Sequence, residues 1–315
     1  MSQPTLAPEF QAMCEALAQM PPIPTLTVAA ARDMWKAFLV GEREPIGEIS
    51  DLRIEGAVGE LDARLYRPDG EPKGVILFLH GGGWVVGDIV THDIGVTALV
   101  RRSDCAVLSV NYRLAPDTPF PGGLEDCYAA LRWLDGHRDE LGLADLPLMV
   151  SGDSAGGNLA AALAILARDR SGPGIDGQIL LYPVTDGRRS LPSYIERGTG
   201  GLLTAADMEW FWSHYVSGEA ALDPLASPLL HPDLTGLPPA VLVTAEFDPL
   251  RDEGREYAAR LCDAGVACKV LHFDDLPHGF LTSYMLAPSA DRAITEISGA
   301  IRELAEQIAA KLTTD

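Results

Sequence analysis

Short apolar runs alternate with amphipathic helical patterns along most of this chain, and that alternation limits which folds it can adopt. The apolar runs occupy residues 74–79, 106–112, 147–152, 178–182, 240–245 and 267–273. Such short, continuous runs are typical of strands that are buried on both faces of a sheet. Helical patterns separate most of the runs, at residues 124–134, 155–169 and 251–264, and a final one covers residues 291–312. This order predicts an α/β fold with a mostly parallel, doubly wound sheet.

The N-terminal part of the chain differs from this alternation. Phe10, Met13, Cys14 and Leu17 follow the spacing of one helix face, and a second helical pattern covers residues 28–40. Short amphipathic helices of this kind need a larger body on which to pack. We therefore treat the first 45 residues as a helical segment that lies on the rest of the molecule.

A second exception lies at about residues 186–225, which contain no strand-like run. This segment is too long for a plain loop, so we interpret it as a helical insertion. It is rich in aromatic residues, namely Tyr194, Trp210, Phe211, Trp212 and Tyr215. These rings either form the core of the insertion or line an apolar pocket. The remaining chain, residues 46–315, is then one α/β domain that begins with two strands at 51–57 and 60–67.

The charge balance and the cysteines exclude several classes of protein. With 45 acidic and 24 basic residues, the formal net charge is −21, which opposes binding to nucleic-acid phosphates or anionic lipid. The five cysteines are odd in number and lack the paired spacing of a zinc site, so we expect reduced thiols. The N-terminus has no signal-like pattern, and the longest apolar stretch, Leu159–Ala167, is far shorter than the roughly 20 residues that span a bilayer. We therefore expect a cytoplasmic protein that binds neither nucleic acid nor membrane.

The strongest chemical signal is the segment 152–157, with the sequence GDSAGG, between an apolar strand and a helical pattern. A serine at such a corner adopts a strained backbone conformation. Gly152 and Gly156 are needed because side chains there would collide with the neighbouring strand and helix. The helix N-terminus offers free N–H groups and a positive dipole end to a developing oxyanion. The pattern predicts that Ser154 is a nucleophile.

A second signal, the sequence HGGGW at residues 80–84, follows the strand at 74–79 directly. Consecutive glycines leave backbone N–H groups unobstructed by side chains. We expect the loop of Gly81, Gly82 and Gly83 to supply two N–H donors, which act together with the N–H of Ala155. A phosphate-binding loop is the alternative, but the lysine and GxGxxG patterns of such loops are missing. His80 is expected to orient the loop rather than to transfer a proton.

A serine nucleophile needs a base, and the order nucleophile, acid, histidine places that base after a late strand. His278, in the sequence LPHGF, fits this position best, whereas His272 lies inside the preceding strand. Four further histidines come too early or lie in surface-like contexts, namely His92, His137, His214 and His231. Glu246, Asp248 and Asp252 compete for the acid that orients the histidine. We favour Asp248, because it follows the strand directly and precedes Pro249.

Together, these motifs resemble the hormone-sensitive-lipase-like branch of the α/β-hydrolases, which includes bacterial carboxylesterases. The resemblance runs from about residue 45 to the C-terminus and includes the sequences NYRLAP at 111–116 and SPL at 227–229. It implies an α/β-hydrolase fold in which Ser154, Asp248 and His278 form a catalytic triad. It also implies an oxyanion hole made by the Gly81–Gly83 loop and Ala155, and a helical cap made from residues 1–45 and the insertion.

The expected reaction is hydrolysis of short-to-medium acyl esters of small molecules through an acyl-enzyme. Neither a metal nor an organic cofactor is needed for it. An amidase or carbamate hydrolase of the same fold is an alternative, and a peptidase would normally carry a large extra domain. A non-catalytic small-molecule receptor is the alternative from another class, but it would lack the base that His278 provides. Pairing of the last strand, residues 267–273, with a second copy would give a homodimer.

Overall fold

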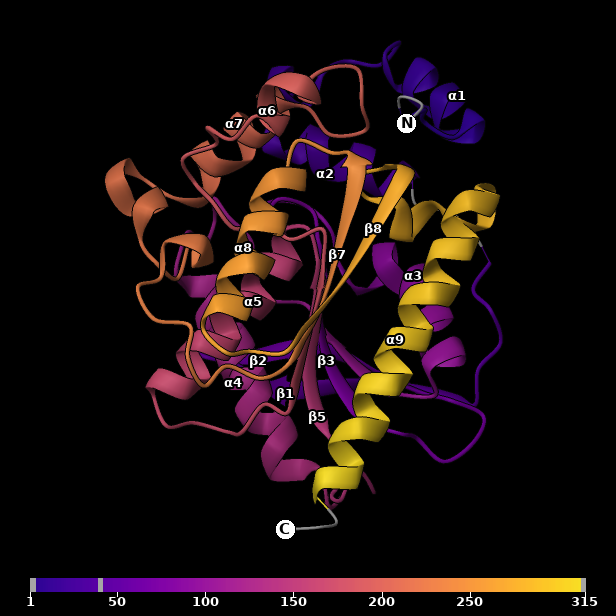
Figure 1. The fold of residues 1–315 in the computed structure, drawn as a ribbon, viewed down its shortest axis with the longest axis vertical. Coiled ribbons are helices and arrows are strands. Elements are labelled where there is room, and N and C mark those ends of the chain that lie inside the picture. Colours follow the sequence, from indigo (N-terminus) through magenta and orange to yellow (C-terminus); the bar gives the residue numbers. More distant parts are fainter. Residues whose placement is uncertain (1–3, 39–41, 313–315) are drawn as a thin grey trace.

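An eight-stranded sheet crosses the middle of the molecule, with helices on both faces (Figure 1). This arrangement comes from a computed structural model, which describes residues 4–38 and 42–312. The strands are β1 (Glu48–Glu55), β2 (Glu60–Arg67), β3 (Val75–Leu79), β4 (Ala106–Val110), β5 (Leu148–Asp153), β6 (Gly177–Leu181), β7 (Ala240–Phe247) and β8 (Cys268–Pro277). Their order in the sheet is β1-β2-β4-β3-β5-β6-β7-β8.

The pairing of these strands confirms the predicted mostly parallel, doubly wound sheet. Only the pairings β1 with β2 and β2 with β4 are antiparallel, and all pairings from β4 through β3 to β8 are parallel. β8 lies at one edge of the sheet. The chain places β4 on one side of β3 and β5 on the other, so the winding direction reverses there. The carboxyl ends of parallel strands at such a reversal form the usual ligand crevice of an open α/β sheet.

The central strands are apolar throughout because both of their faces are covered. In β3, Val75, Leu77 and Leu79 belong to one core cluster, whereas Ile76 and Phe78 belong to the other. Successive strand residues point to opposite faces, so a strand between two helical layers needs an apolar residue at every position. This explains why unbroken apolar runs, rather than alternating patterns, marked these strands in the sequence.

Two helical layers cover the sheet (Figure 1). One layer contains α4 (Gly122–His137), α5 (Ala155–Asp169) and α8 (Arg251–Asp263), and the other contains α3 (Ile89–Ser103) and α9 (Pro288–Leu312). Short 3-10 segments at Pro228–Leu230 and Phe280–Leu286 complete the connections around them. Among residues 4–38 and 42–312, no helix is long and apolar enough to cross a bilayer.

Helix α3 was not among the predicted helices. It packs against α9 and the sheet, and it is buried on most of its surface. Its buried side chains include polar ones, such as Thr91, His92 and Thr97. A helix without a solvent-exposed side does not show the apolar stripe and polar face on which a helical pattern is recognised. The helical spacing of apolar residues was therefore missing from the sequence of α3. Asp88 nevertheless caps the helix by accepting a hydrogen bond from the N–H of Thr91 at 2.8 Å.

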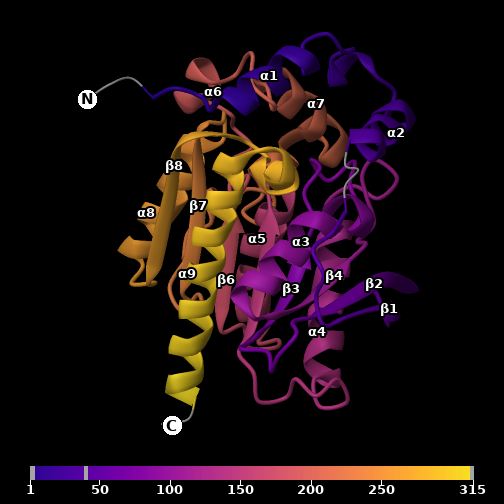
Figure 2. The same ribbon diagram turned by 90° about the vertical axis from the view of Figure 1, so that its right-hand side faces the viewer.

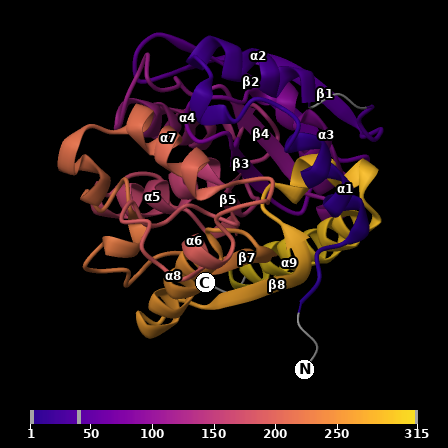
Figure 3. The ribbon, with the colours of Figure 1, turned by 90° about the horizontal axis from the view of Figure 1, so that it is seen from above.

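The N-terminal helices and the insertion lie together over the carboxyl ends of the strands (Figures 2 and 3). The N-terminal part contains α1 (Pro8–Leu17), a 3-10 turn (Ile23–Thr25) and α2 (Val28–Phe38). The insertion contains α6 (Ser193–Glu196), α7 (Ala205–Tyr215) and a 3-10 turn (Gly218–Leu222). As predicted, the insertion has no strand among its described residues. The end of the second predicted helix, at residues 39–40, lies outside the described residues.

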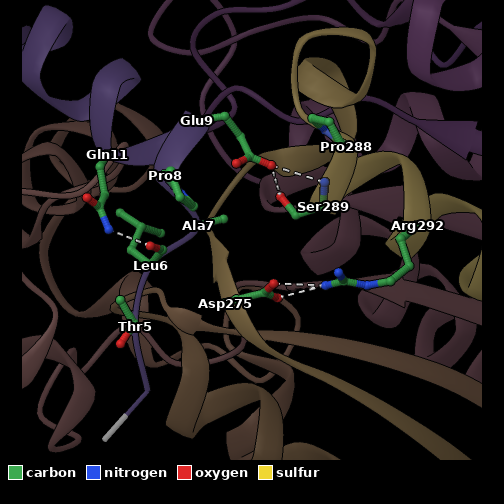
Figure 4. A pocket seen from close by; sticks show the side chains of 10 residues that line it. All are labelled: Thr5, Leu6, Ala7, Pro8, Glu9, Gln11, Asp275, Pro288, Ser289 and Arg292. Atoms are coloured by element: carbon green, nitrogen blue, oxygen red, sulfur yellow. Dashed lines mark hydrogen bonds and ion pairs between the residues drawn. The ribbon is translucent and has the colours of Figure 1, made fainter.

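Hydrogen bonds connect the first helix and the residue before it to the end of β8 and the start of α9 (Figure 4). Oε1 of Glu9 accepts hydrogen bonds from the Ser289 backbone N–H at 3.1 Å and from the Ser289 hydroxyl at 2.6 Å. The Ala7 N–H donates to the Asp275 carbonyl at 2.9 Å. Because Glu9 bonds the free amide and hydroxyl in the first turn of α9, it acts as a helix cap supplied by a distant segment.

Candidate active site

The turn between β5 and α5 holds Ser154 in a strained conformation, as predicted. Its φ is +56° and its ψ is −117°, in a region that residues other than glycine rarely adopt. Two backbone hydrogen bonds hold the turn: the Ser154 N–H donates to the Leu181 carbonyl at 2.9 Å, and the Ser154 carbonyl accepts the N–H of Val184 at 3.2 Å. The neighbouring strand β6 and the residues that directly follow it thus fix the backbone that carries this hydroxyl.

The predicted need for glycine on both sides of Ser154 is confirmed. A Cβ at Gly152 would lie 2.3 Å from backbone atoms of Gly156 and 2.5 Å from the Leu79 carbonyl oxygen. A Cβ at Gly156 would lie only 1.9 Å from that same oxygen. Both clashes are with backbone atoms of β3 and α5, which cannot move aside without shifting the sheet.

Replacing Gly156 with alanine is therefore expected to destabilise the protein by more than about 3 kcal/mol, because the added methyl group overlaps the end of β3. Chemical denaturation would measure this loss. Gly299→Ala in α9 is the matched control, since its Cβ meets nothing within 4 Å. Alanine in a helix interior is favoured over glycine by about 0.5–1 kcal/mol, so the control should be slightly stabilised. A Gly156→Ala variant as stable as the parent would contradict this account.

Ser154, His278 and Asp248 form one chain of hydrogen bonds. The Ser154 Oγ lies 2.8 Å from Nε2 of His278, and Nδ1 of the same ring lies 2.8 Å from Oδ2 of Asp248. All three side chains are buried, and Asp248 has no exposed surface. Because a carboxylate only accepts, the Nδ1 hydrogen of His278 points to Asp248. Nε2 is therefore free to accept the hydroxyl proton of Ser154.

The competing acids have other partners. Glu246 accepts from Arg197 at 2.6 Å and from Arg251 at 2.8 Å. Asp252 lies in the first turn of α8, as expected, and accepts from the backbone of Ser193 and from Arg251. Asp248 itself is held by the Leu250 N–H, which donates to its Oδ1 at 2.8 Å. This bond leaves Oδ2 for the histidine.

The glycine loop after β3 lies directly beside this chain, because β3 and β5 are neighbours in the sheet. Gly82 and Gly83 adopt φ values of +111° and +57°, which glycine tolerates at no steric cost. Within the described ranges, the N–H groups of Gly82, Gly83 and Ala155 have no hydrogen-bond partner. The Gly81 N–H differs, since it donates to Oδ1 of Asp153 at 2.9 Å. Gly81 is therefore not available as one of the predicted oxyanion donors; it anchors the loop instead.

His80 lies behind the loop and is almost completely buried. Its Nδ1 is 2.8 Å from the Gly81 carbonyl oxygen, and its ring stacks on Tyr112 with 4.4 Å between centroids. Burial, together with the nearby charge of His92, lowers the pKa of His80 to about 4. This neutral ring supports the loop, in agreement with the expected orienting role. His272, also as expected, lies in β8, where its Nδ1 contacts the Thr244 hydroxyl at 2.9 Å.

Aromatic rings of the insertion cover the glycine loop. Trp84 stacks on Tyr215 with centroids 4.0 Å apart and 2° between the planes. Phe211 lies against Gly83, where a Cβ would come within 2.1 Å of its ring. The core-packing alternative for these aromatics thus holds, because Trp212 and Phe211 are both buried, whereas an apolar pocket lined by them stays a prediction.

Three buried polar residues around the site were missed by sequence reasoning. The Asn158 side chain donates to the carbonyls of Val184 and Ala226 and accepts from Trp84. Asp153 and His92 meet behind the glycine loop, with Oδ1 and Nε2 3.4 Å apart. His92 comes too early in the chain to be the base, as predicted, but it is 1% exposed and lies in the interior. The only available signal was the position of Asp153 and Asn158 within or next to the GDSAGG motif.

Comparison with known proteins places this geometry in a family. A family model described as the alpha/beta hydrolase fold matches residues 76–282. The carboxylic ester hydrolase LipN of Mycobacterium tuberculosis is 43% identical over 263 residues, which are 81% of this chain and 70% of LipN. Ethyl acetate hydrolase of Pseudomonas putida is 36% identical over 276 residues, 85% of this chain and 86% of the relative.

The solved structures agree with these relatives. A hyperthermophilic esterase from the archaeon Pyrobaculum calidifontis superposes with a TM-score of 0.90 at 39% identity, covering 96% of this chain and 99% of that one. An ester hydrolase from the metagenome of Lake Arreo has a TM-score of 0.90 at 35% identity, covering 95% and 99%. The chain therefore belongs to the α/β-hydrolase fold family, in the hormone-sensitive-lipase-like branch of bacterial esterases that its motifs predicted.

Proposed function

We propose that this protein is a serine carboxylesterase in which Ser154, His278 and Asp248 form the catalytic triad. One observation carries the proposal: the Ser154 hydroxyl is hydrogen-bonded to His278, which is hydrogen-bonded in turn to Asp248. The relatives named as carboxylic ester hydrolase and ethyl acetate hydrolase support the same reaction. The helices of residues 1–45 and of the insertion would act as the cap over this site.

In the first half of the reaction, Ser154 Oγ attacks the ester carbonyl carbon while its proton passes to Nε2 of His278. The carbonyl oxygen becomes an oxyanion, and the N–H groups of Gly82, Gly83 and Ala155 are the donors that would stabilise it. Asp248 stabilises the imidazolium of His278 through Nδ1–H. Collapse of the tetrahedral intermediate breaks the C–O bond, and the alcohol leaves with the proton from Nε2.

The second half repeats these steps with water. His278 removes a proton from water as the oxygen attacks the acyl-Ser154 carbonyl, and the same N–H groups stabilise the second oxyanion. The acid departs when Ser154 takes the proton back. Every charge that develops is therefore balanced by a group of this chain.

The substrates are proposed to carry short-to-medium acyl chains. Phe211 lies directly against Gly83, which narrows the space above the proposed oxyanion donors. A relative is named as an ethyl acetate hydrolase, which is an activity on a two-carbon acyl group. We therefore expect kcat/KM to be at least about tenfold higher for the butyryl than for the octadecanoyl p-nitrophenyl ester. Phe211→Ala should reduce this ratio by opening the space, and faster turnover of the octadecanoyl ester by the parent would contradict the proposal.

Hydrolysis of amides or carbamates would use the same residues. A parallel assay with a p-nitroanilide of the same acyl group separates this alternative from ester hydrolysis. The cytoplasmic location and the homodimer through β8 stay predictions from the sequence.

A further inference from the structure

A buried carboxylate and a buried imidazole meet directly behind the glycine loop. Oδ1 of Asp153 accepts the N–H of Gly81 at 2.9 Å, and Nε2 of His92 lies 3.4 Å from the same oxygen. The Gly81 N–H also lies 3.2 Å from Nε2 of His92; a neutral ring would accept this hydrogen bond, whereas an imidazolium leaves the N–H to Asp153, the nearer partner. Asp153 is 4% exposed and His92 is 1% exposed. These groups therefore interact without being screened by solvent.

The hydrogen bonds around His92 indicate which of its nitrogens carry hydrogens. The Thr91 hydroxyl donates to the Asp88 carbonyl at 2.8 Å, so its single hydrogen is committed. Nδ1 of His92 lies 3.1 Å from that hydroxyl oxygen and 3.2 Å from that carbonyl oxygen. Both neighbours act as acceptors, so Nδ1 must donate. A neutral ring would then direct the Nε2 lone pair toward the Asp153 carboxylate, whereas an imidazolium directs an N–H there.

The charge of Asp153 matters because of where it lies. Its carboxylate packs against the Cα of Gly81, since a Cβ there would come within 2.4 Å of Oδ2. The next two residues carry the proposed oxyanion donors, and the next residue after Asp153 is Ser154 itself. An unbalanced negative charge at this position would oppose formation of an oxyanion, because electrostatic interactions are strong in a buried, low-dielectric site.

We propose that His92 is a positioning residue for ester hydrolysis: as an imidazolium it neutralises Asp153, which allows this carboxylate to anchor Gly81 without opposing the oxyanion. The inference rests on the proposed function of Ser154. It assigns a role to a histidine that touches neither the substrate nor the triad.

The other groups that face the pair do not provide this compensation. Burial lowers the pKa of His80 to about 4, so His80 is neutral at the pH of catalysis. Tyr112 and Tyr182 also face Asp153, and burial raises the pKa of both phenols well above the usual value. The remaining charged neighbour is Asp88, which is itself negative. Burial alone would lower the pKa of His92, but the charge of Asp153, its hydrogen bond to the ring and the neighbouring Asp88 together raise that pKa.

The test compares His92→Gln, Asp153→Asn and the double variant with the parent. We expect His92→Gln to lower kcat at pH 8 by about 10- to 100-fold, with KM changed less than about threefold, because Asp153 is left as an uncompensated charge. Asp153→Asn should lose clearly less activity than His92→Gln, because it keeps an acceptor for Gly81 and removes the charge. The double variant should recover most of the activity lost in His92→Gln.

The proposal also predicts the direction in which the activity of His92→Gln, relative to the parent, changes with pH. Without its counter-ion, the buried Asp153 carboxyl has a raised pKa, so it is neutral at low pH and charged at high pH. The kcat of His92→Gln relative to the parent should therefore fall as the pH rises from about 6 to about 9. His272→Gln is the matched control. His272 also faces an acid, since its Nε2 lies 3.4 Å from Glu246, but it lies in β8 rather than behind the glycine loop. Its activity relative to the parent should not change with pH.

A second measurement needs neither a variant nor turnover. Nitrogen-15 NMR of the histidine-labelled parent should show both ring nitrogens of His92 protonated at pH 8. A neutral His92, or a double variant no more active than His92→Gln, would overturn the proposal even if the protein proves to be an esterase. An inactive parent would overturn the proposed function instead, while the NMR result still decides the charge state of the pair.

Discussion

Replacing Ser154 with alanine is expected to lower kcat for a p-nitrophenyl ester by about a million-fold. The variant lacks the oxygen that is proposed to form the acyl-enzyme, and among the described residues no other hydroxyl lies in the hydrogen-bonded chain of His278 and Asp248. The fold should be retained, because alanine is smaller than serine and the strained turn is held by backbone hydrogen bonds to Leu181 and Val184. Initial rates and thermal unfolding would be measured on the same preparation.

Labelling provides the control for this prediction. A fluorophosphonate reacts with an activated serine, so mass spectrometry of the parent should find one adduct, on the peptide that contains Ser154. The alanine variant should remain unlabelled. A folded variant that keeps more than about one hundredth of the parent activity would mean that the reaction uses another nucleophile.

The second large effect is expected from Asp248→Asn, which should lower kcat about ten-thousand-fold. The Leu250 N–H donates to Oδ1 of Asp248, so the amide oxygen of the asparagine will take that side. Its NH₂ group then points at Nδ1 of His278 and makes that nitrogen an acceptor. The neutral ring must carry its hydrogen on Nε2, where it can no longer accept the Ser154 proton.

Asp252→Asn is the matched control for this variant. Asp252 lies four residues further along the chain, and its carboxylate contacts Arg251 and the Ser193 backbone rather than the histidine. We expect its kcat to stay within about threefold of the parent, because the surrounding charge changes but the tautomer of His278 does not. If both substitutions lower kcat equally, Asp248 is not the orienting acid.

The candidate site was predictable from sequence to the extent that local backbone geometry dictated it. Gly152 and Gly156 are required by contacts with β3 that any side chain would violate, so they marked the nucleophile turn. His278 and Asp248 follow late strands, and the parallel order of the sheet brings them to the same edge. Each of these residues is recognisable because its position along the chain restricts its position in space.

The residues that escaped prediction are those whose role depends on what packs against them. Helix α3 showed no amphipathic pattern because α9, the segment Phe280–Leu286 and the sheet together bury most of its residues. His92, in its first turns, was set aside as a candidate base, and its contact with Asp153 follows only from the placement of α3. Gly81 was grouped with Gly82 and Gly83 because the three are identical in sequence, although only Gly81 has an acceptor behind its N–H.

The sequence by itself determined the fold class, the strained turn at Ser154 and the order of the candidate catalytic residues along the chain. These features follow from local sterics and from the apolar character of strands buried on both faces. The tertiary structure decided which amide hydrogens remain free, which carboxylate reaches His278, and which buried charge is balanced by which partner. Those outcomes depend on distances between segments far apart in the chain. The energies of hydrogen bonds and of interactions between buried charges change sharply when such a distance changes by about one or two ångströms.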